Sequence, residues 1–471
     1  MKKLLLLALA LPSLALATPP LVEGPPPASP PLGELAAGLR DESLHRDTLA
    51  WELLESLTTE VGPRLAGTEA EGRARDWAVR RLTELGFANV HVEPFEMDVW
   101  VRGEERAEIV SPFPQPLAIT ALGNSGATPA RGIEAQVVHF DSVATLEAAP
   151  DEAVRGRIVF ITHNMQANQD GSGYGQFGAP RRTGPSLASR KGAVGIVIRS
   201  IGTDYHRNPH TGVQDWAEGV RPIPAGALSI PDAEQLQRIL ARAGERPVRM
   251  RLTLTPRNIG RRQSGNVVAE VPGSDPDAGV ILIGGHLDSW DLGTGAIDNA
   301  AGIAITTAAA HRIMQAGQPR RTIRIVLFGA EEVGVFGGTA YFERHRGEGN
   351  VVLVAESDFG ADRVWRFTTN FTPANAALAS RIQALLAPLG IVRGRDRANA
   401  GADLGAWATA GVAAIDLNQD GTRYFDYHHT PDDTLDKVDP AQLRQNVAAW
   451  TAVLAAAANA PEPIAAPGPA R

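Results

Sequence analysis

A regular alternation of short apolar runs and longer helical segments in the second half of the chain constrains its fold most strongly. After Asn258, runs rich in β-branched residues and too short for helices are each followed by a segment of helical length. Parallel strands of one sheet need a long crossover connection, usually a helix. This order therefore predicts an α/β fold, with a mostly parallel sheet flanked by helices on both faces. The expected strands are 279–285, 322–329, 351–356 and 412–417, and the expected helices lie near 299–316, 338–346, 374–388 and 440–458.

The first half of the chain contributes fewer elements to this domain and then changes in character. Two amphipathic helices near 47–61 and 68–85 are followed by a strand at 89–95. From residue 107 to 256, short β-branched runs alternate with loops, which predicts an inserted β-rich module. Its expected strands are 133–140, 157–162, 195–199 and 248–254, and its expected helix is 232–243. The main domain would then consist of residues 45–106 and 257–460.

The two ends of the chain carry segments that we expect to lie outside the fold. Residues 1–17 combine two lysines, an apolar stretch and an Ala15-Leu16-Ala17 end, which is typical of a signal peptide. The apolar stretch is shorter than the ~20 residues that span a membrane. Residues 18–44 are expected to form a proline-rich tether, and residues 461–471 a disordered tail. We therefore predict an exported protein, periplasmic or secreted, without a membrane anchor after signal cleavage.

The composition excludes several classes of protein. The 471 residues are 44% hydrophobic and 21% charged, which is typical of a globular enzyme. A net charge of -8 without a basic block argues against nucleic acid or an anionic membrane as the main partner. The chain has no cysteine. Any bound metal must therefore be held by His, Asp and Glu side chains.

Potential metal ligands follow three successive strands of the predicted sheet. His286 and Asp288 come after the first strand, Glu331 and Glu332 after the second, and Asp358 after the third. Ligands of open α/β sheets gather outside the carboxyl ends of the strands, so these side chains are expected to share one crevice. The residues expected to join them are Asp298 and the loop Tyr427-His428-His429-Thr430.

This set of side chains is suited to two metal ions. Two divalent ions about 3.5 to 4 Å apart repel each other, so they need a bridging carboxylate, for which Asp298 is the best candidate. His286 and Asp358 would then bind one ion. Glu332 and His429 would bind the other. Mixed nitrogen and oxygen ligands without sulfur favour zinc, with cobalt or manganese as substitutes.

The adjacent glutamates have different expected roles. Neighbours on an extended segment point in different directions, so Glu332 is expected to bind metal while Glu331 stays free. We predict that Glu331 is the general base, which takes a proton from water and returns it to the leaving amine. Asp288 is expected to accept a hydrogen bond from the far ring nitrogen of His286.

Several other polar and aromatic residues have open roles. His428 is expected to face substrate or an oxyanion, and Tyr427 and Trp290 to line the pocket. Arg64, in a glycine-flanked turn, is expected to be a surface or packing group, and Asp403 a helix cap. His206 and His210 are expected to be surface histidines. The cationic candidates for a peptide carboxylate are Arg181, Arg182 and Arg363.

At these motifs the chain resembles a known superfamily. The segments GGHLDSWDLGTGAIDNAAG, FGAEEVGVFGG, ESDFG and YHHTPDDT are similar to those of the co-catalytic zinc exopeptidases of the aminopeptidase Y and glutamate carboxypeptidase superfamily, in particular its carboxypeptidase Q (plasma glutamate carboxypeptidase) branch. The resemblance implies a zinc exopeptidase fold with an inserted protease-associated-like domain, two zinc ions per chain, hydrolysis of dipeptides or short peptides, and homodimers. It also implies His286 and Asp358 on one zinc, Asp298 as bridge, Glu332 and His429 on the other, and Glu331 as the catalytic glutamate.

Two other functions are compatible with the same fold. A glutaminyl cyclase-like acyltransferase would use a single zinc ion, and a non-catalytic receptor ectodomain would have lost the ligands. Metal stoichiometry separates these alternatives from the two-zinc peptidase. Whether the peptidase removes an amino-terminal or a carboxy-terminal residue, or splits only dipeptides, depends on loops whose contacts the sequence leaves open.

Overall fold

The computed structural model describes residues 32–465, 467 and 468, and it contains two eight-stranded sheets. The first sheet has the strand order β1-β10-β12-β11-β13-β16-β14-β15. Its central strands β12, β11, β13 and β16 run parallel to one another. Strand β10 pairs antiparallel with both β1 and β12, and β14 pairs antiparallel with β16 and parallel with β15. The strands are β1 (Ala88–Val101), β10 (Arg257–Val271), β11 (Val280–His286), β12 (Thr322–Phe328), β13 (Val351–Glu356), β14 (Val364–Thr369), β15 (Val392–Arg393) and β16 (Ala413–Gln419). The predicted α/β class is confirmed.

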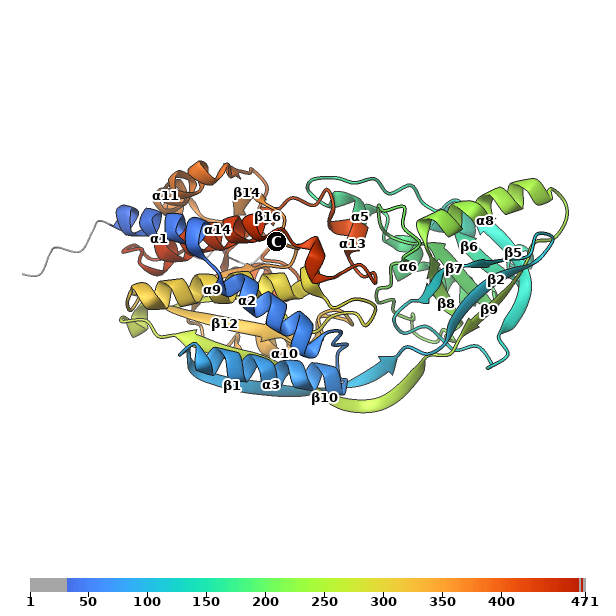
Figure 1. Ribbon diagram of the computed structural model, residues 1–471, viewed down its shortest axis with the longest axis horizontal. Helices are drawn as coiled ribbons and strands as arrows, with labels where there is room; N and C mark the ends of the chain where they lie inside the picture. Colours follow the sequence, from blue (N-terminus) through green and yellow to red (C-terminus); the bar gives the residue numbers. More distant parts are fainter. Residues whose placement is uncertain (1–31, 466, 469–471) are drawn as a thin grey trace, which may run out of the picture. The chain divides into compact units, whose positions relative to one another are not determined.

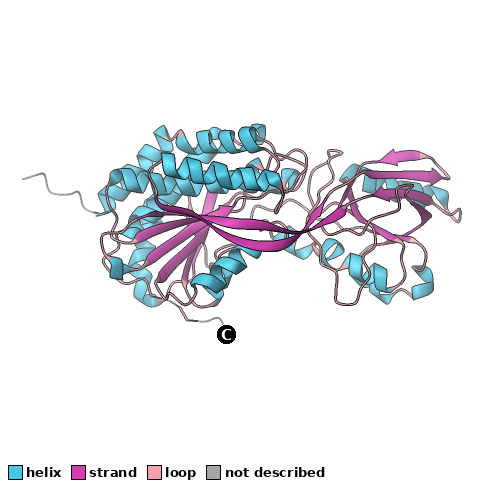
Figure 2. Ribbon diagram, turned by 90° about the horizontal axis from the view of Figure 1, so that it is seen from below, coloured by secondary structure: helices cyan, strands magenta, loops and turns pink. Residues whose placement is uncertain are grey.

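Helices cover both faces of this sheet because the central strands are apolar on both sides (Figure 2). Ile281 and Ile283 of β11 pack into one core cluster, and Leu282 between them packs into another on the opposite face. The first cluster includes α9 (Ala301–Ala316) and α14 (Pro440–Ala458), and the second includes α10 (Phe336–His345) and α12 (Gly405–Thr409). The remaining helices of this part are α2 (Leu49–Ser56), α3 (Glu69–Glu84), α11 (Ala376–Leu386) and α13 (Tyr424–Tyr427), with short helical turns at Leu57–Val61 and Ala296–Ala300.

The second sheet is formed by residues between Glu105 and Leu254, and all but the first two of them lie in the predicted inserted module, residues 107–256. Its strand order is β3-β2-β9-β5-β6-β7-β8-β4. The strands are β2 (Glu105–Ser111), β3 (Gln115–Leu117), β4 (Ile119–Ala121), β5 (Ile133–Phe140), β6 (Ile158–Ile161), β7 (Gly195–Arg199), β8 (Ala225–Leu228) and β9 (Arg249–Leu254). The helices are α4 (Val143–Ala148), α5 (Ser172–Gln176), α6 (Ala179–Arg182), α7 (Gly184–Arg190) and α8 (Ile230–Ala243). Figure 1 labels α5, α6 and α8 among them. The likeness to a protease-associated domain and the module boundaries stay predictions.

The structure corrects two expectations about the chain ends. Residues 18–44 were expected to be a tether, yet residues 32–46 form helix α1 (Leu32–Arg46), because Ser43 hydrogen-bonds Thr451 of α14 and Arg40 donates to the oxygen of Leu385. The expected disordered tail 461–471 is ordered at Ile464, which is 6% exposed. The predicted signal peptide 1–17 lies outside the described residues. Among the residues described, no helix is long and apolar enough to cross a membrane.

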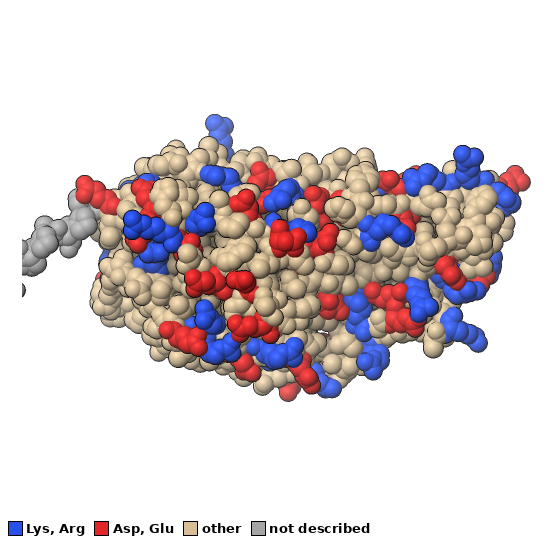
Figure 3. All heavy atoms as spheres, viewed as in Figure 1, with Lys and Arg blue, Asp and Glu red and all other residues tan. Residues whose placement is uncertain are grey.

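The length of the antiparallel pair β1 and β10 was also underestimated. The expected strand 89–95 extends to Val101, and residues 257–271 form its partner. The register pairs Phe95 with Ser264 and continues to Val101 opposite Arg257. The two strands link the two sheets in sequence, since β2 follows β1 and β9 precedes β10. Lys, Arg, Asp and Glu are interspersed over the molecular face in Figure 3, in agreement with the absence of a basic block in the sequence.

Candidate metal centre

The first part of the site lies at the carboxyl ends of β11 and β13. His286 is the last residue of β11 and is 1% exposed. Its Nε2 atom lies 3.0 Å from Oδ1 of Asp298 and 3.3 Å from Oδ1 of Asp358. One imidazole nitrogen and two carboxylate oxygens thus face a common point, an arrangement that can hold a metal ion.

The second oxygen of Asp298 faces a different set of side chains. Oδ2 of Asp298 lies 3.3 Å from Nε2 of His429 and 3.4 Å from Nε2 of His428. Oε2 of Glu332 lies 2.9 Å from the same nitrogen of His429. Asp298 therefore stands between two groups of potential ligands, with one carboxylate oxygen toward each.

Asp298 is held in this position by the loop that leads into α9. The side chain of Asn299 donates to the backbone oxygen of Ser357 at 2.8 Å and accepts from the backbone N–H of Gly302 at 3.1 Å. Gly302 is required for this approach, since a Cβ atom there would lie 1.9 Å from the oxygen of Ser357. The start of α9 is thereby fixed against the chain segment that carries Asp358.

Three carboxylate oxygens of the site are buried without a hydrogen-bond partner among the described residues. They are Oδ2 of Asp298, Oε1 of Glu332 and Oδ1 of Asp358. A buried charged oxygen without a partner is costly, by several kcal/mol or more, unless a cation neutralises it. These oxygens, which form no hydrogen bond, belong to the three carboxylates that the sequence proposes as ligands, so the donor set fits two divalent ions.

The far nitrogens of the histidines distinguish His429 from His428. Nδ1 of His286 lies 3.0 Å from the backbone oxygen of Asp288, and Nδ1 of His429 lies 3.4 Å from the backbone oxygen of Thr211. An imidazole that binds metal usually donates its other N–H to such an acceptor, which leaves the cavity-facing nitrogen free to coordinate. Nδ1 of His428 is buried and has no partner among the described residues. The geometry thus favours His429 as the ligand.

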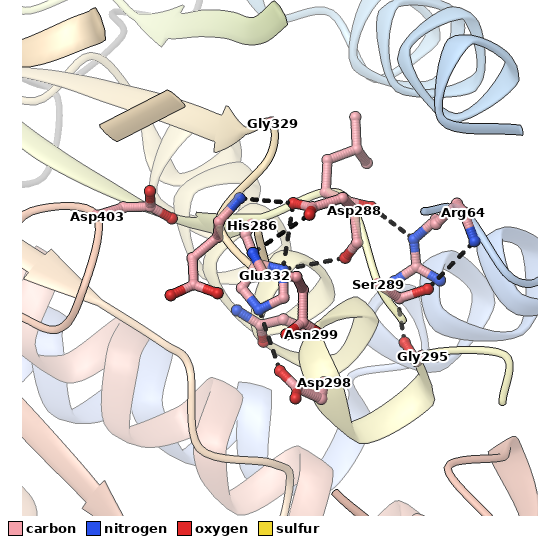
Figure 4. A network of polar contacts seen from close by, with 12 residues as sticks. Arg64, His286, Asp288, Ser289, Gly295, Asp298, Asn299, Gly329, Glu332 and Asp403 are labelled. Atoms are coloured by element: carbon pink, nitrogen blue, oxygen red, sulfur yellow. Dashed lines mark hydrogen bonds and ion pairs between the residues drawn. The ribbon is translucent and has the colours of Figure 1, made fainter. Parts of the chain in front are cut away.

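Asp288 makes a different contact from the one expected. Its backbone oxygen, and not its carboxylate, accepts from the far nitrogen of His286; the carboxylate lies 3.6 Å away. The carboxylate instead accepts from the backbone N–H groups of Glu331 at 3.0 Å and Glu332 at 3.3 Å. Figure 4 shows Asp288 with Glu332 and His286 beside it. The chain after β12 passes close to the end of β11, where Asp288 lies. Asp288 therefore fixes the turn that contains the two glutamates.

Glu331 and Glu332 lie in a strained turn beside the cavity. Ala330 just before them and Val335 just after them have positive φ angles, 59° and 56°, which non-glycine residues rarely adopt. Such strain is common at functional sites. Both glutamates line a cavity of about 380 Å³, together with Asp298, Asp358 and the two histidines.

Burial of so many charges shifts several pKa values. Burial raises the pKa of Glu331 well above its usual range, although nearby His286 acts in the opposite direction. Burial also raises the pKa of Glu332 to about 7, with the charge of Asp298 adding to the effect. For His286, burial lowers the pKa, but Asp358 and the other carboxylates outweigh this effect and raise it well above the usual value. The pattern reflects crowded carboxylates that cations would stabilise together.

The structure places some of the expected pocket residues elsewhere. Tyr427 does not line the cavity; Tyr424, one helical turn earlier on α13 and on the same face as His428, does. Trp290 packs near the ring of His429, with 5.8 Å between ring centroids. Asp403 was expected to cap the helix that follows it in sequence. Its carboxylate instead accepts a hydrogen bond from the backbone N–H of Gly338 in α10.

Two residues outside the proposed ligand set, Arg64 and Asp433, hold the loops of the site by hydrogen bonds to the backbone. Arg64 is fully buried and donates to the backbone oxygens of Leu287, Thr294 and Gly295. Asp433 accepts from the backbone N–H of Ile297 at 2.7 Å, and burial raises its pKa to about 8. The sequence signal for Asp433 was its place four residues after His429.

Of the two histidines expected at the surface, His210 differs from the prediction. His206 is exposed, but His210 is 2% exposed and its Nε2 atom lies 2.8 Å from Oδ1 of the buried Asp204. The following residue, Thr211, donates its backbone N–H to the oxygen of His429 at 3.0 Å. The loop that contains His210 therefore braces the loop that contains His429, a relation between residues far apart in sequence.

The chain is similar to known peptidases. Residues 266–454 match the model of peptidase family M28. Carboxypeptidase Q from Bos taurus is 35% identical over 408 residues, which cover 86% of this chain and 84% of that protein. Carboxypeptidase Q from Homo sapiens is 35% identical over 406 residues, with 86% and 84% covered. These matches confirm the resemblance inferred from the motifs.

Solved structures share the fold. The crystal structure of a peptidase M28 precursor from Shewanella amazonensis SB2B is 44% identical and superimposes with a TM-score of 0.89 over 93% of this chain and 99% of that one. An aminopeptidase from Aneurinibacillus sp. strain AM-1 has a TM-score of 0.62 at 19% identity, over 93% and 98% of the two chains. At that identity the second structure supports the fold alone.

Proposed function

Because the chain belongs to peptidase family M28 and is a metallopeptidase, we propose that it is an exported two-zinc exopeptidase that hydrolyses dipeptides or other short peptides. The observation that carries the proposal is the position of Asp298, with one carboxylate oxygen 3.0 Å from His286 and the other 3.3 Å from His429. A carboxylate between two ligand sets is the arrangement that a pair of close divalent ions needs.

The proposed ligands divide into two sets around this bridge. His286 and Asp358 would hold one ion, and Glu332 and His429 the other, with Asp298 shared. The donors are imidazole nitrogens and carboxylate oxygens, which suit zinc, and the chain has no thiolate to offer.

Glu331 is the proposed general base. It lines the same cavity as the ligands, and its backbone is fixed by the carboxylate of Asp288. When bound, zinc ions would polarise the scissile carbonyl and lower the pKa of the attacking water. Glu331 would accept the proton of that water and return it to the nitrogen of the leaving amine. Asp288 acts as a positioning residue in this scheme. His428, which lines the cavity, would contact substrate.

The size of the cavity supports short substrates. A volume of about 380 Å³ lies at the low end of the range for small-molecule sites, and it suits a dipeptide or the end of a peptide. Export is supported by the signal-like sequence of residues 1–17. Association into homodimers is part of the proposal and is testable by light scattering on the purified protein.

Metal stoichiometry together with turnover tests the proposal. The purified protein, dialysed against zinc and then against buffer, should contain two zinc ions per chain by mass spectrometry and should hydrolyse unblocked dipeptides. One zinc ion, with cyclisation of amino-terminal glutamine, would support the glutaminyl cyclase alternative instead. Absence of bound metal and of hydrolysis would support the receptor alternative.

A further inference from the structure

We propose that Arg181 binds the free carboxyl-terminal carboxylate of the peptide substrate, so that the enzyme requires an unblocked carboxyl end. This inference rests on the proposed function and adds the recognition of one substrate group to it. Arg181 lies on α6, in the part of the chain assigned to the inserted module, and not among the strand ends that carry the proposed ligands.

Arg181 borders the metal centre directly. It lines the same cavity as Glu331, His428 and His429. The side chain is almost completely buried, at 5% exposure, so its charge is shielded from bulk solvent. Its position in the wall of the cavity means that a bound peptide would meet the guanidinium group beside the reacting bond.

The guanidinium group has no carboxylate partner in the described part of the chain. No Asp or Glu oxygen of that part forms an ion pair with it within 4.0 Å. One terminal nitrogen donates to the hydroxyl of Tyr174 at 2.5 Å and to the backbone oxygen of Thr211 at 3.4 Å. The Nε atom is buried without a partner. Buried charges are normally paired, so the guanidinium group of Arg181 is suited to bind an anionic group of the substrate.

The group is also held in a fixed orientation. The guanidinium carbon lies 5.1 Å from the centre of the Tyr174 ring, which in turn stacks on Phe425 at 4.7 Å. Gly212, with a φ of +136°, leaves the necessary space, since a Cβ atom there would lie 2.1 Å from a terminal nitrogen of Arg181. An oriented planar fork loses little entropy when it binds a carboxylate through two hydrogen bonds.

The charge balance favours a substrate carboxylate over an internal counterion. Apart from Glu331, the carboxylates that line the cavity are those proposed to hold the zinc ions, and the metals would neutralise them. A positively charged amino terminus would be repelled by Arg181 and by its exposed neighbour Arg182, which also lines the cavity. Arg363, the third cation considered from the sequence, is not in the cavity lining and donates instead to the oxygen of Leu389.

Three substrates test the proposal on the zinc-loaded enzyme: Ala-Leu, Ala-leucinamide and N-acetyl-Ala-Leu. The wild type should hydrolyse Ala-Leu with a kcat/KM about 100-fold above that for Ala-leucinamide. Arg181→Met should lower kcat/KM for Ala-Leu about 100-fold and change that for Ala-leucinamide less than about 3-fold. Arg181→Lys, which keeps the charge but not the planar fork, should give an intermediate loss. Arg190→Met, an exposed arginine at the end of α7, is the matched control and should behave as wild type.

The outcomes separate this inference from the proposed function. If Arg181→Met lowers kcat/KM equally for Ala-Leu and Ala-leucinamide, or if the wild type hydrolyses both equally well, the role of Arg181 is overturned. The proposed peptidase function would still stand. Failure of the zinc-loaded wild type to hydrolyse any of the three would overturn both. Competition on the wild type avoids any folding defect: N-acetyl-leucine should inhibit at least about 10-fold more strongly than N-acetyl-leucinamide, and equal inhibition contradicts the proposal.

Discussion

The buried guanidinium group of Arg64 donates a hydrogen bond of 2.6 Å to the backbone oxygen of Leu287, although 223 residues separate the two in sequence. It donates another of 2.6 Å to the oxygen of Thr294. Both oxygens belong to the loop that joins His286 to Asp298. Arg64 therefore fixes the separation of two proposed ligands without lying in the cavity itself.

Replacement of Arg64 should destabilise the protein and weaken metal binding. Arg64→Met leaves several buried carbonyl oxygens without donors, and we expect a loss of about 3 kcal/mol in the free energy of unfolding. Urea denaturation and zinc content would measure the two effects. Arg73→Met, an exposed arginine on α3, is the control. A stable Arg64→Met variant with full zinc content would show that the loop holds its shape without this side chain.

Removal of the proposed base should separate metal binding from turnover. Glu331→Gln keeps the size of the side chain but cannot accept a proton, so zinc content should stay at two ions per chain while kcat falls by about 10² to 10⁴. Glu343→Gln, an exposed glutamate on α10, should have no effect. Substantial activity in Glu331→Gln would assign the proton transfer to another group.

Removal of the proposed bridge should affect both ions. Asp298→Ala deletes both carboxylate oxygens that face the two ligand sets, so zinc content and hydrolysis should be lost together. Mass spectrometry after dialysis measures the metal, with Asp277→Ala, at an exposed helical turn, as control. Two tightly bound ions in Asp298→Ala would refute the bridge.

Acid should destabilise the protein through His163, which lies two residues after the end of β6. Its Nε2–H donates to the oxygens of Arg199 and Ser200, and its Nδ1 accepts from the N–H of Met165, so the neutral ring satisfies both nitrogens. Burial lowers the pKa of His163 from 6.5 to about 4. The unfolded chain therefore binds an extra proton between these values, and the stability present above pH 6.5 is lost as the pH falls toward 4.

The variant His163→Gln measures this contribution. The loss of unfolding free energy between pH 7 and pH 4.5 should be smaller in the variant than in the wild type, by up to ~3 kcal/mol. Urea denaturation at several pH values gives the difference, in which the contributions of all shared groups cancel. His45→Gln, at the exposed end of α1, should reproduce the wild-type pH dependence. An unchanged pH dependence in His163→Gln would contradict the assignment.

The parallel arrangement of neighbouring strands explains why the ligand set could be predicted from the sequence. His286 and Asp358 follow two apolar runs, and β11 and β13 indeed lie side by side and parallel in the sheet. Their side chains meet because the carboxyl ends of parallel strands share one edge. The boundaries of β13 and α14 agree with the expected ranges, since apolar runs and proline or acidic caps are local signals.

Contacts between distant loops could not be predicted in the same way. The sequence predicts Tyr427 as a pocket residue, whereas the orientation of α13 places Tyr424 in the lining of the cavity. The sequence predicts that the carboxylate of Asp288 accepts a hydrogen bond from His286. The path of the chain after β12 instead brings the N–H groups of Glu331 and Glu332 to it. Helix α1 was missed because its apolar side is defined by its packing on α14, and not by its own periodicity.

The sequence alone determined the α/β class, the strand ends that carry His286 and Asp358, and a donor set without sulfur. These properties follow from the apolar periodicity and the residue types of each segment, and both can be read from that segment alone. Only the tertiary structure decided that Arg64 braces the ligand loop and that Arg181 lines the cavity with no carboxylate partner in the described part of the chain. Such contacts depend on the free energy of packing segments that are far apart in the chain, and no local pattern records them.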